Sequence, residues 1–219
     1  TSSLVGSEMC IRDSSTDGTT EAIDEFKDDE RLIHLIPERN DLGIGGCWNL
    51  GVHHPLCGKF AVQLDSDDVY AHDGTLQVMV NAFYEQNCAM VVGTYMMTDF
   101  DMNMIAPGII DHKEWTPENG RNNALRINGL GAPRAFYTPI LRELKVPNTS
   151  YGEDYALGLN FSRQYQIGRV YEAVYLCRRW DDNSDASLDI VKMNAHNLYK
   201  DRIRTWELQA RIALNKKQR

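Results

Sequence analysis

Apolar and polar residues alternate along the chain in blocks that predict strands and helices in turn. Short apolar runs predict buried strands over residues 31–37, 59–64, 89–97 and 169–176. Apolar residues at helical spacing predict helices over residues 18–28, from about residue 44, over 73–87 and around 152–164. This alternation favours an α/β fold with a mostly parallel central sheet that helices flank on both faces.

The remaining segments have weaker or different patterns. Residues 99–126 are polar and predict irregular structure, whereas residues 128–137 mix turn and strand signals before a short helix, TPILREL. The C-terminal segment, residues 191–219, predicts an amphipathic helix. Its inward stripe consists of Tyr199, Ile203, Trp206, Ala210 and Ala213. Its basic residues are expected in solvent: Lys200, Arg202, Arg204, Lys216 and Lys217.

Charge and cysteine content narrow the class of protein. The 219-residue chain has a net charge of −8, which argues against nucleic acid as a partner. Residues 192–219 hold eight Lys or Arg and two Asp or Glu, so they carry +6 against −14 elsewhere. The five cysteines are scattered and show no CxxC spacing, which is typical of reduced thiols in a cytosolic protein.

Three acids follow the strand predicted over residues 59–64. Asp65, Asp67 and Asp68 lie within four positions, where their like charges repel. Open parallel sheets bind ligands beyond the carboxyl ends of their strands, and a divalent cation such as Mn²⁺ or Mg²⁺ there would remove the repulsion. A solvated acidic turn that caps the helix starting near Asp73 accounts for the same residues equally well.

The order of several motifs carries a family resemblance. The segments DSSTDGTTEAI, NDLGIGGCWNLGV, GKFAVQLDSDD, GEDYALGL and YLCRRW follow one another between Asp13 and Trp180. This order resembles the family-2 glycosyltransferases of the GT-A fold, a nucleotide-diphospho-sugar transferase fold. The resemblance implies transfer of a sugar from a nucleoside-diphosphate donor to an acceptor, with inversion at the anomeric carbon. The acceptor would be a glycan, a lipid-linked sugar or a small molecule, as in cell-envelope polysaccharide synthesis.

The resemblance also implies roles on the donor side. Asp65 and Asp67 match a D-x-D motif, in which Asp67 would be a metal ligand and Asp65 would touch the metal or the ribose. Asp13 matches an acid that hydrogen-bonds the base. Asn40 and Gly43 match a turn that approaches the nucleotide. Turn or cap chemistry is the alternative for Asp13, Asn40 and Gly43.

Two later motifs, GEDYALGL and YLCRRW, imply further roles in the reaction. By resemblance, Asp154 is the general base for the acceptor hydroxyl and Glu153 is its partner, although both also suit a helix N-terminus. Arg179 would neutralise a phosphate and Trp180 would stack on a sugar face. The motif of processive members is incomplete because Leu176 occupies its Gln position, which argues against a processive polymerase.

The first residues depart from the family pattern. Only twelve residues precede Asp13, too few for the first strand that normally helps to hold the base. We therefore expect a non-native leader over residues 1–12, a transferase domain incomplete at its N-terminus over 13–190, and the C-terminal helix over 191–219. A basic residue of the family is also replaced, by Trp48.

Other functions and partners stay open on the sequence alone. A nucleotidylyltransferase of related fold, or a binding domain that has lost its chemistry, would share the α/β pattern. The C-terminal helix would pack on its own domain, pair with a second copy in a homodimer, or attach peripherally to anionic lipid at the inner face of a membrane. The absence of an apolar run of about 20 residues argues against a membrane span.

Overall fold

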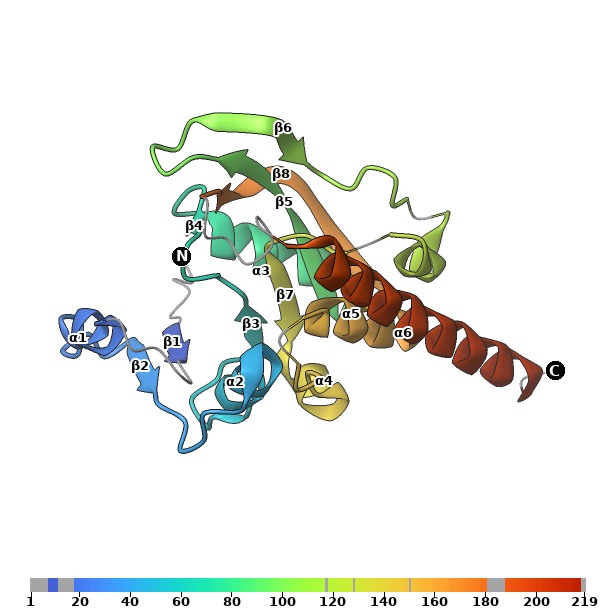
Figure 1. The fold of residues 1–219 in the computed structure, drawn as a ribbon, viewed down its shortest axis with the longest axis horizontal. Helices are drawn as coiled ribbons and strands as arrows, with labels where there is room; N and C mark the ends of the chain where they lie inside the picture. Colours follow the sequence, from blue (N-terminus) through green and yellow to red (C-terminus); the bar gives the residue numbers. More distant parts are fainter. Residues whose placement is uncertain are drawn as a thin grey trace.

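A computed structural model of the chain describes residues 8–11, 18–116, 118–127, 129–149, 151–180 and 188–217 (Figure 1). Strands and helices alternate along it. In chain order they are β1 (Glu8–Ile11), α1 (Thr19–Asp24), β2 (Leu32–Leu35), α2 (Gly43–His53), β3 (Phe60–Val62), β4 (Val69–Tyr70), α3 (Thr75–Glu85), β5 (Met90–Thr98), β6 (Met104–Ile110), the 3₁₀ helix η1 (Gly120–Leu125), β7 (Arg134–Tyr137), α4 (Thr138–Leu144), α5 (Glu153–Gln164), β8 (Ile167–Arg178) and α6 (Ile190–Lys217).

The main sheet has six strands and is mixed. Five of them follow the order β3-β7-β5-β8-β4, and β6 pairs with β5. The two longest strands, β5 and β8, run parallel from the Met90–Ile167 pair to the Thr98–Arg178 pair. The other pairings in this sheet are antiparallel. The predicted α/β class is confirmed, with a sheet that is not purely parallel.

Helices cover both faces of this sheet, as the hydrophobic pattern predicts. Alternate side chains of β5 point to opposite faces. Met90 and Val92 pack in one cluster with Phe161 of α5. Val91 packs in a second cluster with Met79 of α3. Two apolar cores therefore lie on the two faces of β5, one beneath α3 and one beneath α5.

The N-terminal strands form a separate small sheet. β1 pairs with β2 in parallel, from Glu8 opposite Leu32 to Ile11 opposite Leu35. Figure 1 shows β1, β2 and α1 to one side of the main sheet. β1 lies inside the expected leader, so residues 8–11 take part in the fold. That residues 1–12 are non-native stays a prediction.

The sequence pattern missed three strands. The twelve residues before Asp13 were expected to be too few for a first strand, yet Glu8–Ile11 forms β1. Residues 99–126 were expected to be irregular, yet Met104–Ile110 forms β6 and pairs with β5. This strand contains Pro107 and Gly108, which weaken a strand signal, and most of its side chains are exposed because it pairs on one side only in the described chain. The two residues of β4 are too few to give a periodic pattern.

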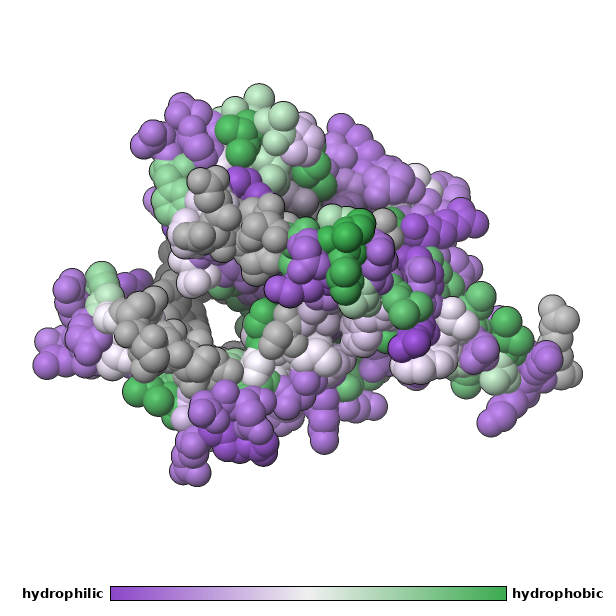
Figure 2. Space-filling view, viewed as in Figure 1, coloured by the Kyte–Doolittle hydropathy of each residue, from purple (hydrophilic) through white to green (hydrophobic). Residues whose placement is uncertain are grey.

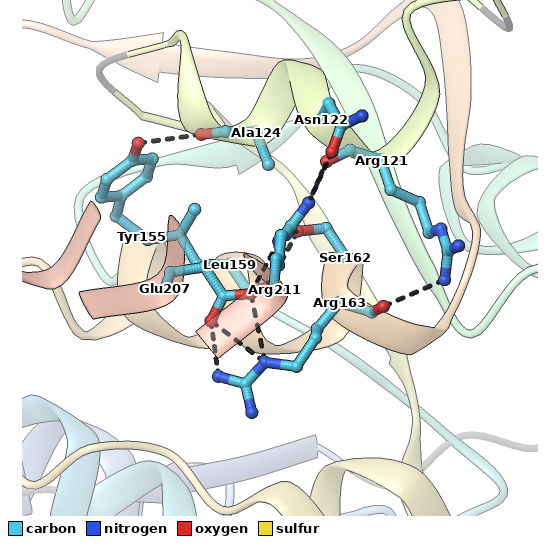
Figure 3. A network of polar contacts seen from close by, with 9 residues as sticks. All are labelled: Arg121, Asn122, Ala124, Tyr155, Leu159, Ser162, Arg163, Glu207 and Arg211. Carbon is cyan, nitrogen blue, oxygen red and sulfur yellow. Dashed lines mark hydrogen bonds and ion pairs between the residues drawn. The ribbon is translucent and has the colours of Figure 1, made fainter. Parts of the chain in front are cut away.

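The C-terminal helix packs on its own domain through polar contacts. Glu207 of α6 is buried and accepts hydrogen bonds from Arg163 of α5 and Arg211 of α6 (Figure 3). Arg211 also donates to the Ser162 hydroxyl at 2.6 Å. The described helices include none that is long and apolar enough to cross a membrane.

Two residues of α6 face opposite to the expectation. Arg204, expected in solvent, donates to the Tyr155 hydroxyl and to the Ile127 carbonyl. Trp206, expected on the inward stripe, is 63 % exposed. The long arginine side chain reaches the facing segment. In Figure 2 hydrophobic residues lie scattered along α6 among hydrophilic ones rather than in one continuous patch.

The cysteines whose side chains the structure describes are free thiols. They are Cys47, Cys57, Cys88 and Cys177. Burial raises the pKa of Cys88 and of Cys177 to about 11.

The buried carboxylate of Glu207 gives a stability prediction. We expect Glu207→Ala to lower the free energy of unfolding by about 3 kcal/mol, because it leaves the largely buried Arg211 without its carboxylate partner. Asp201→Ala is the matched control, since it breaks an exposed ion pair to Arg204 and should cost less than about 1 kcal/mol. Urea unfolding measures both, and equal losses would contradict this reading.

Candidate active site

The three clustered acids have different surroundings. Asp68 is buried, and its Oδ1 accepts the backbone N–H of Arg178 at 2.8 Å. Burial raises the pKa of Asp68, and the charges of Asp67 and Asp65 add to the effect. Asp68 therefore fastens the turn after β3 to the end of β8. Asp65 and Asp67 remain partly exposed on that turn.

Asp65 and Asp67 are each held by specific donors. Oδ1 of Asp65 accepts from Gln63 Nε2 at 2.6 Å, and the Asp65 backbone N–H donates to the Tyr175 hydroxyl at 3.1 Å. Oδ2 of Asp67 accepts from Trp180 Nε1 at 3.3 Å. These bonds fix the turn in place, and the carboxylates of Asp65 and Asp67 both stay partly exposed to solvent.

Asp65 and Asp67 fit a divalent-cation site in which the substrate supplies some of the metal ligands. The described residues include no group of three or more His, Cys, Asp or Glu arranged to hold a metal ion. Mg²⁺ and Mn²⁺ commonly take only one or two carboxylates from a protein and complete their shell with phosphates and water. Asp65 and Asp67 therefore suit a cation that arrives with a diphosphate, and they do not make a closed metal site.

The end of β8 brings a basic and an aromatic residue to the same turn. The Arg178 guanidinium donates through Nε to the Asp67 carbonyl and lies 4.5 Å from the centre of the Phe100 ring. Trp180 packs edge-on against Phe100 at 6.1 Å and is 46 % exposed. The indole of Trp180 is thus beside Asp67 with part of its surface open to a ligand.

Sequence reasoning selected Trp180 but missed Arg178 beside it. The backbone N–H of Arg179 donates to the Thr98 carbonyl, which continues the pairing of β8 with β5. Period-two alternation places Arg178 and Trp180 on one side of the strand end and Arg179 on the other. That alternation was the available signal for Arg178, and the phosphate role of Arg179 stays a prediction.

The two acids of the E-D pair begin α5. Glu153 is buried, and burial raises its pKa, with the nearby charge of Asp154 as the next cause. Oδ2 of Asp154 accepts from Arg134 Nη1 at 2.7 Å, and its Oδ1 accepts the Tyr155 backbone N–H at 2.7 Å. The side chain of Arg134 is 9 % exposed. Asp154 is therefore a partly buried, ion-paired carboxylate.

A line of hydrogen bonds joins the two groups of acids. Arg134 Nε donates to Gln63 Oε1 at 2.7 Å, and Gln63 Nε2 donates to Asp65. Asp154 is thus linked to Asp65 through two intervening side chains. Sequence reasoning missed both linking residues, although each is a polar residue inside or next to an apolar strand segment, FAVQL or PRAFY.

The glycine-rich turn before α2 has a packing role. A Cβ on Gly45 would lie 1.7 Å from the Pro147 carbonyl oxygen, so only glycine permits this approach. Gly43 adopts φ 60° where α2 begins. Asn40 is exposed, and the contacts of the described residues do not join it to Asp65 or Asp67.

Trp48 and Asp13 complete the predicted set. Trp48 packs on Phe136 in the core beneath α5, and the Arg134 guanidinium lies 5.8 Å from its ring centre. It is therefore a core residue that also borders the ion pair of Arg134. Asp13 lies outside the described residues.

Comparison with known proteins places the chain among the glycosyltransferases. The model of the family described as Glycosyl transferase family 2 matches residues 9–139. No match was found among curated proteins.

Solved structures match the fold. The structure of S. aureus TarS residues 1–349 in complex with UDP-GlcNAc is 17 % identical, with a TM-score of 0.67 over 92 % of this chain and 62 % of that one. The mannosyltransferase PcManGT from Pyrobaculum calidifontis, in complex with GDP-Man and Mn²⁺, is 16 % identical, with a TM-score of 0.58 over 81 % and 49 %. The chain spans less than two thirds of the length of either protein.

The buried Glu153 gives a pH prediction. Its pKa is raised above 4.5 in the folded protein, so the folded state holds the proton more tightly than the unfolded state. Below its ordinary pKa, Glu153 is protonated in both states and does not reduce the stability of the folded protein. As the pH rises from that ordinary pKa to the raised one, ionisation favours the unfolded state, so Glu153 becomes destabilising. We expect the stability of Glu153→Gln relative to wild type to increase with pH over that window. Urea unfolding at several pH values checks this, and a pH-independent difference would contradict it.

Proposed function

The chain belongs to glycosyltransferase family 2, and we propose that it transfers a sugar from a nucleoside-diphosphate donor to an acceptor hydroxyl, with inversion at the anomeric carbon. The observation that carries the proposal is the hydrogen-bonded line from Asp65 to Asp154. Donor-side and acceptor-side acids are thereby joined across β3, β7 and α5. A single displacement needs both, one group near the leaving diphosphate and one near the attacking hydroxyl.

On the donor side, Asp67 and Asp65 would hold a Mn²⁺ or Mg²⁺ ion. The cation would stabilise the charge that grows on the leaving diphosphate. The structures of two structural neighbours, PcManGT and GalNAc-T7, are complexes with Mn²⁺, which supports the choice of metal. GalNAc-T7, in complex with UDP, GalNAc and Mn²⁺, is 13 % identical, with a TM-score of 0.57 over 80 % of this chain and 38 % of that one.

The remaining donor contacts follow from the family resemblance and the position of β8. Trp180 would stack on a sugar face, for which its half-exposed indole beside Asp67 is suitable. Arg179 would neutralise a phosphate. Asp13 would hydrogen-bond the base, and the turn of Asn40 and Gly43 would approach the nucleotide.

On the acceptor side, Asp154 would take the proton of the attacking hydroxyl. Its two oxygens each accept one hydrogen bond, which leaves further lone pairs for that hydroxyl. Glu153, buried at the start of α5, would be the partner of Asp154. The acceptor is a sugar or a lipid-linked sugar, and the basic face of α6 would suit approach to anionic lipid.

Transfer by Asp154→Asn tests the proposed reaction. With UDP- and GDP-sugars and Mn²⁺, we expect the wild-type chain to release UDP or GDP and to form a product of inverted anomeric configuration. Asp154→Asn should lose about 10²–10⁴-fold in kcat, because it cannot accept the proton, while donor affinity changes by only a few-fold. Asp73→Asn is the matched control, an acid of the exposed turn before α3.

Two outcomes would overturn the proposal. Near wild-type transfer by Asp154→Asn would remove it as the base. Release of pyrophosphate from a nucleoside triphosphate, with no diphosphate from any sugar donor, would indicate nucleotidyl transfer instead.

A further inference from the structure

Arg134 is a buried cation whose hydrogen bonds run toward two different parts of the site. It opens β7, which lies between β3 and β5 in the sheet. Its Nη1 donates to Asp154 Oδ2 at 2.7 Å and to the Gly131 carbonyl at 2.5 Å. Its Nε donates to Gln63 Oε1 at 2.7 Å, and the Trp48 ring lies beside the guanidinium. The planar, multiply bonded guanidinium is therefore fixed on several sides.

Gln63 extends this contact to the donor side. The Gln63 backbone N–H donates to the Arg134 carbonyl at 2.9 Å, so the two residues are fixed next to one another by main chain as well as side chain. Since its Oε1 accepts from Arg134, the amide Nε2 is turned toward Asp65 and donates to Oδ1 at 2.6 Å. An amide can serve this purpose because it carries an acceptor and a donor on one planar group.

The charges around Arg134 make it the cation shared by several acids. Arg134 lowers the pKa of Glu153, whereas the charges of Asp154 and Asp65 raise it, so all four groups lie close enough to interact. Three carboxylates that share a partly buried region repel one another without a cation between them. Arg178, another positive group at this rim, contacts the Asp67 carbonyl and Phe100 instead.

We propose that Arg134 is a positioning residue that, through Gln63, couples the donor-side acid Asp65 to the acceptor-side acid Asp154. The proposal rests on the proposed function for the meaning of the two sides. Arg134 fixes the direction of the Asp154 carboxylate, and the Gln63 bridge fixes the direction of Asp65. A displacement of either acid therefore passes to the other through three hydrogen bonds, and donor and acceptor are held in one geometry.

Steady-state kinetics of transfer separate the contact of Arg134 with Asp154 from the contact of Gln63 with Asp65. Arg134→Met should lower kcat by about 10²-fold, the loss that a small misplacement of a catalytic group produces. Arg134→Lys should recover most of that loss but not all, because lysine keeps the charge and lacks the fork of donors. Gln63→Met should act mainly on the KM of the donor, since it leaves the pair of Arg134 and Asp154 intact.

The matched control is another partly buried arginine. Arg142 donates to the backbone carbonyls of Val52 and His54, away from the acids. Arg142→Met should lower stability while kcat and KM stay close to wild type. If Arg134 served stability alone, its variants would change the midpoint of urea unfolding as Arg142→Met does, with kcat per folded molecule unchanged, and the proposal would be wrong.

A double-mutant cycle in urea unfolding tests the coupling without any activity. Arg134→Met and Asp65→Asn should be non-additive in the native background and additive in a Gln63→Met background, because Gln63 is the bridge between them. Additive effects in both backgrounds would overturn the coupling. If no sugar donor is turned over while the cycle shows coupling, the proposed reaction fails and the Arg134 link stands.

Discussion

The arrangement of the site depends on a buried arginine placed among acids. Asp65, Glu153 and Asp154 come from two regions almost 90 positions apart in the sequence, and their like charges oppose bringing them together. Arg134 offsets that repulsion, and Gln63 gives it the reach to contact both regions. Removing one partner of such a buried pair leaves an uncompensated charge.

The backbone makes this placement possible. The long parallel pairing of β5 with β8 carries the end of β8 to the turn that follows β3, where the Arg178 N–H meets Asp68. Antiparallel pairing of β7 with β3 sets Arg134 beside Gln63. The antiparallel strand β7 lies between β3 and β5, which run in the same direction. It thereby places Arg134, the residue that joins the acids, between these two strands.

Local pattern was sufficient for the class of fold and for most elements. The α/β alternation, the helices beginning at Gly43, Thr75 and Glu153, and the strand Met90–Thr98 follow from apolar periodicity. The family was recognisable because several motifs occur in order, which no single DxDD segment would show. The pattern failed for β6, whose Pro107 and Gly108 hide an edge strand.

The features of the site that could not be predicted from the sequence depend on contacts between distant residues. Nothing local distinguishes Asp68 from Asp67, yet Asp68 is buried against β8 while Asp67 stays partly exposed. Arg134 and Gln63 carry no family motif, and only the register of β3 with β7 makes them partners. Arg178 is next to the predicted Arg179, and only the contacts at the end of β8 show that its side chain meets the turn of Asp67. The roles assigned by resemblance to the predicted site residues, Asp13, Asn40 and Gly43 among them, stay predictions.

The most direct test of the account is the position of Mn²⁺ in crystals grown with UDP or GDP. Anomalous scattering locates the ion without any assumption about the sugar or the acceptor. The account predicts one peak shared by the carboxylates of Asp65 and Asp67 and the nucleotide diphosphate, with Asp154 still paired to Arg134. A nucleotide bound with its metal at other residues, or a diphosphate bound away from this turn, would contradict it.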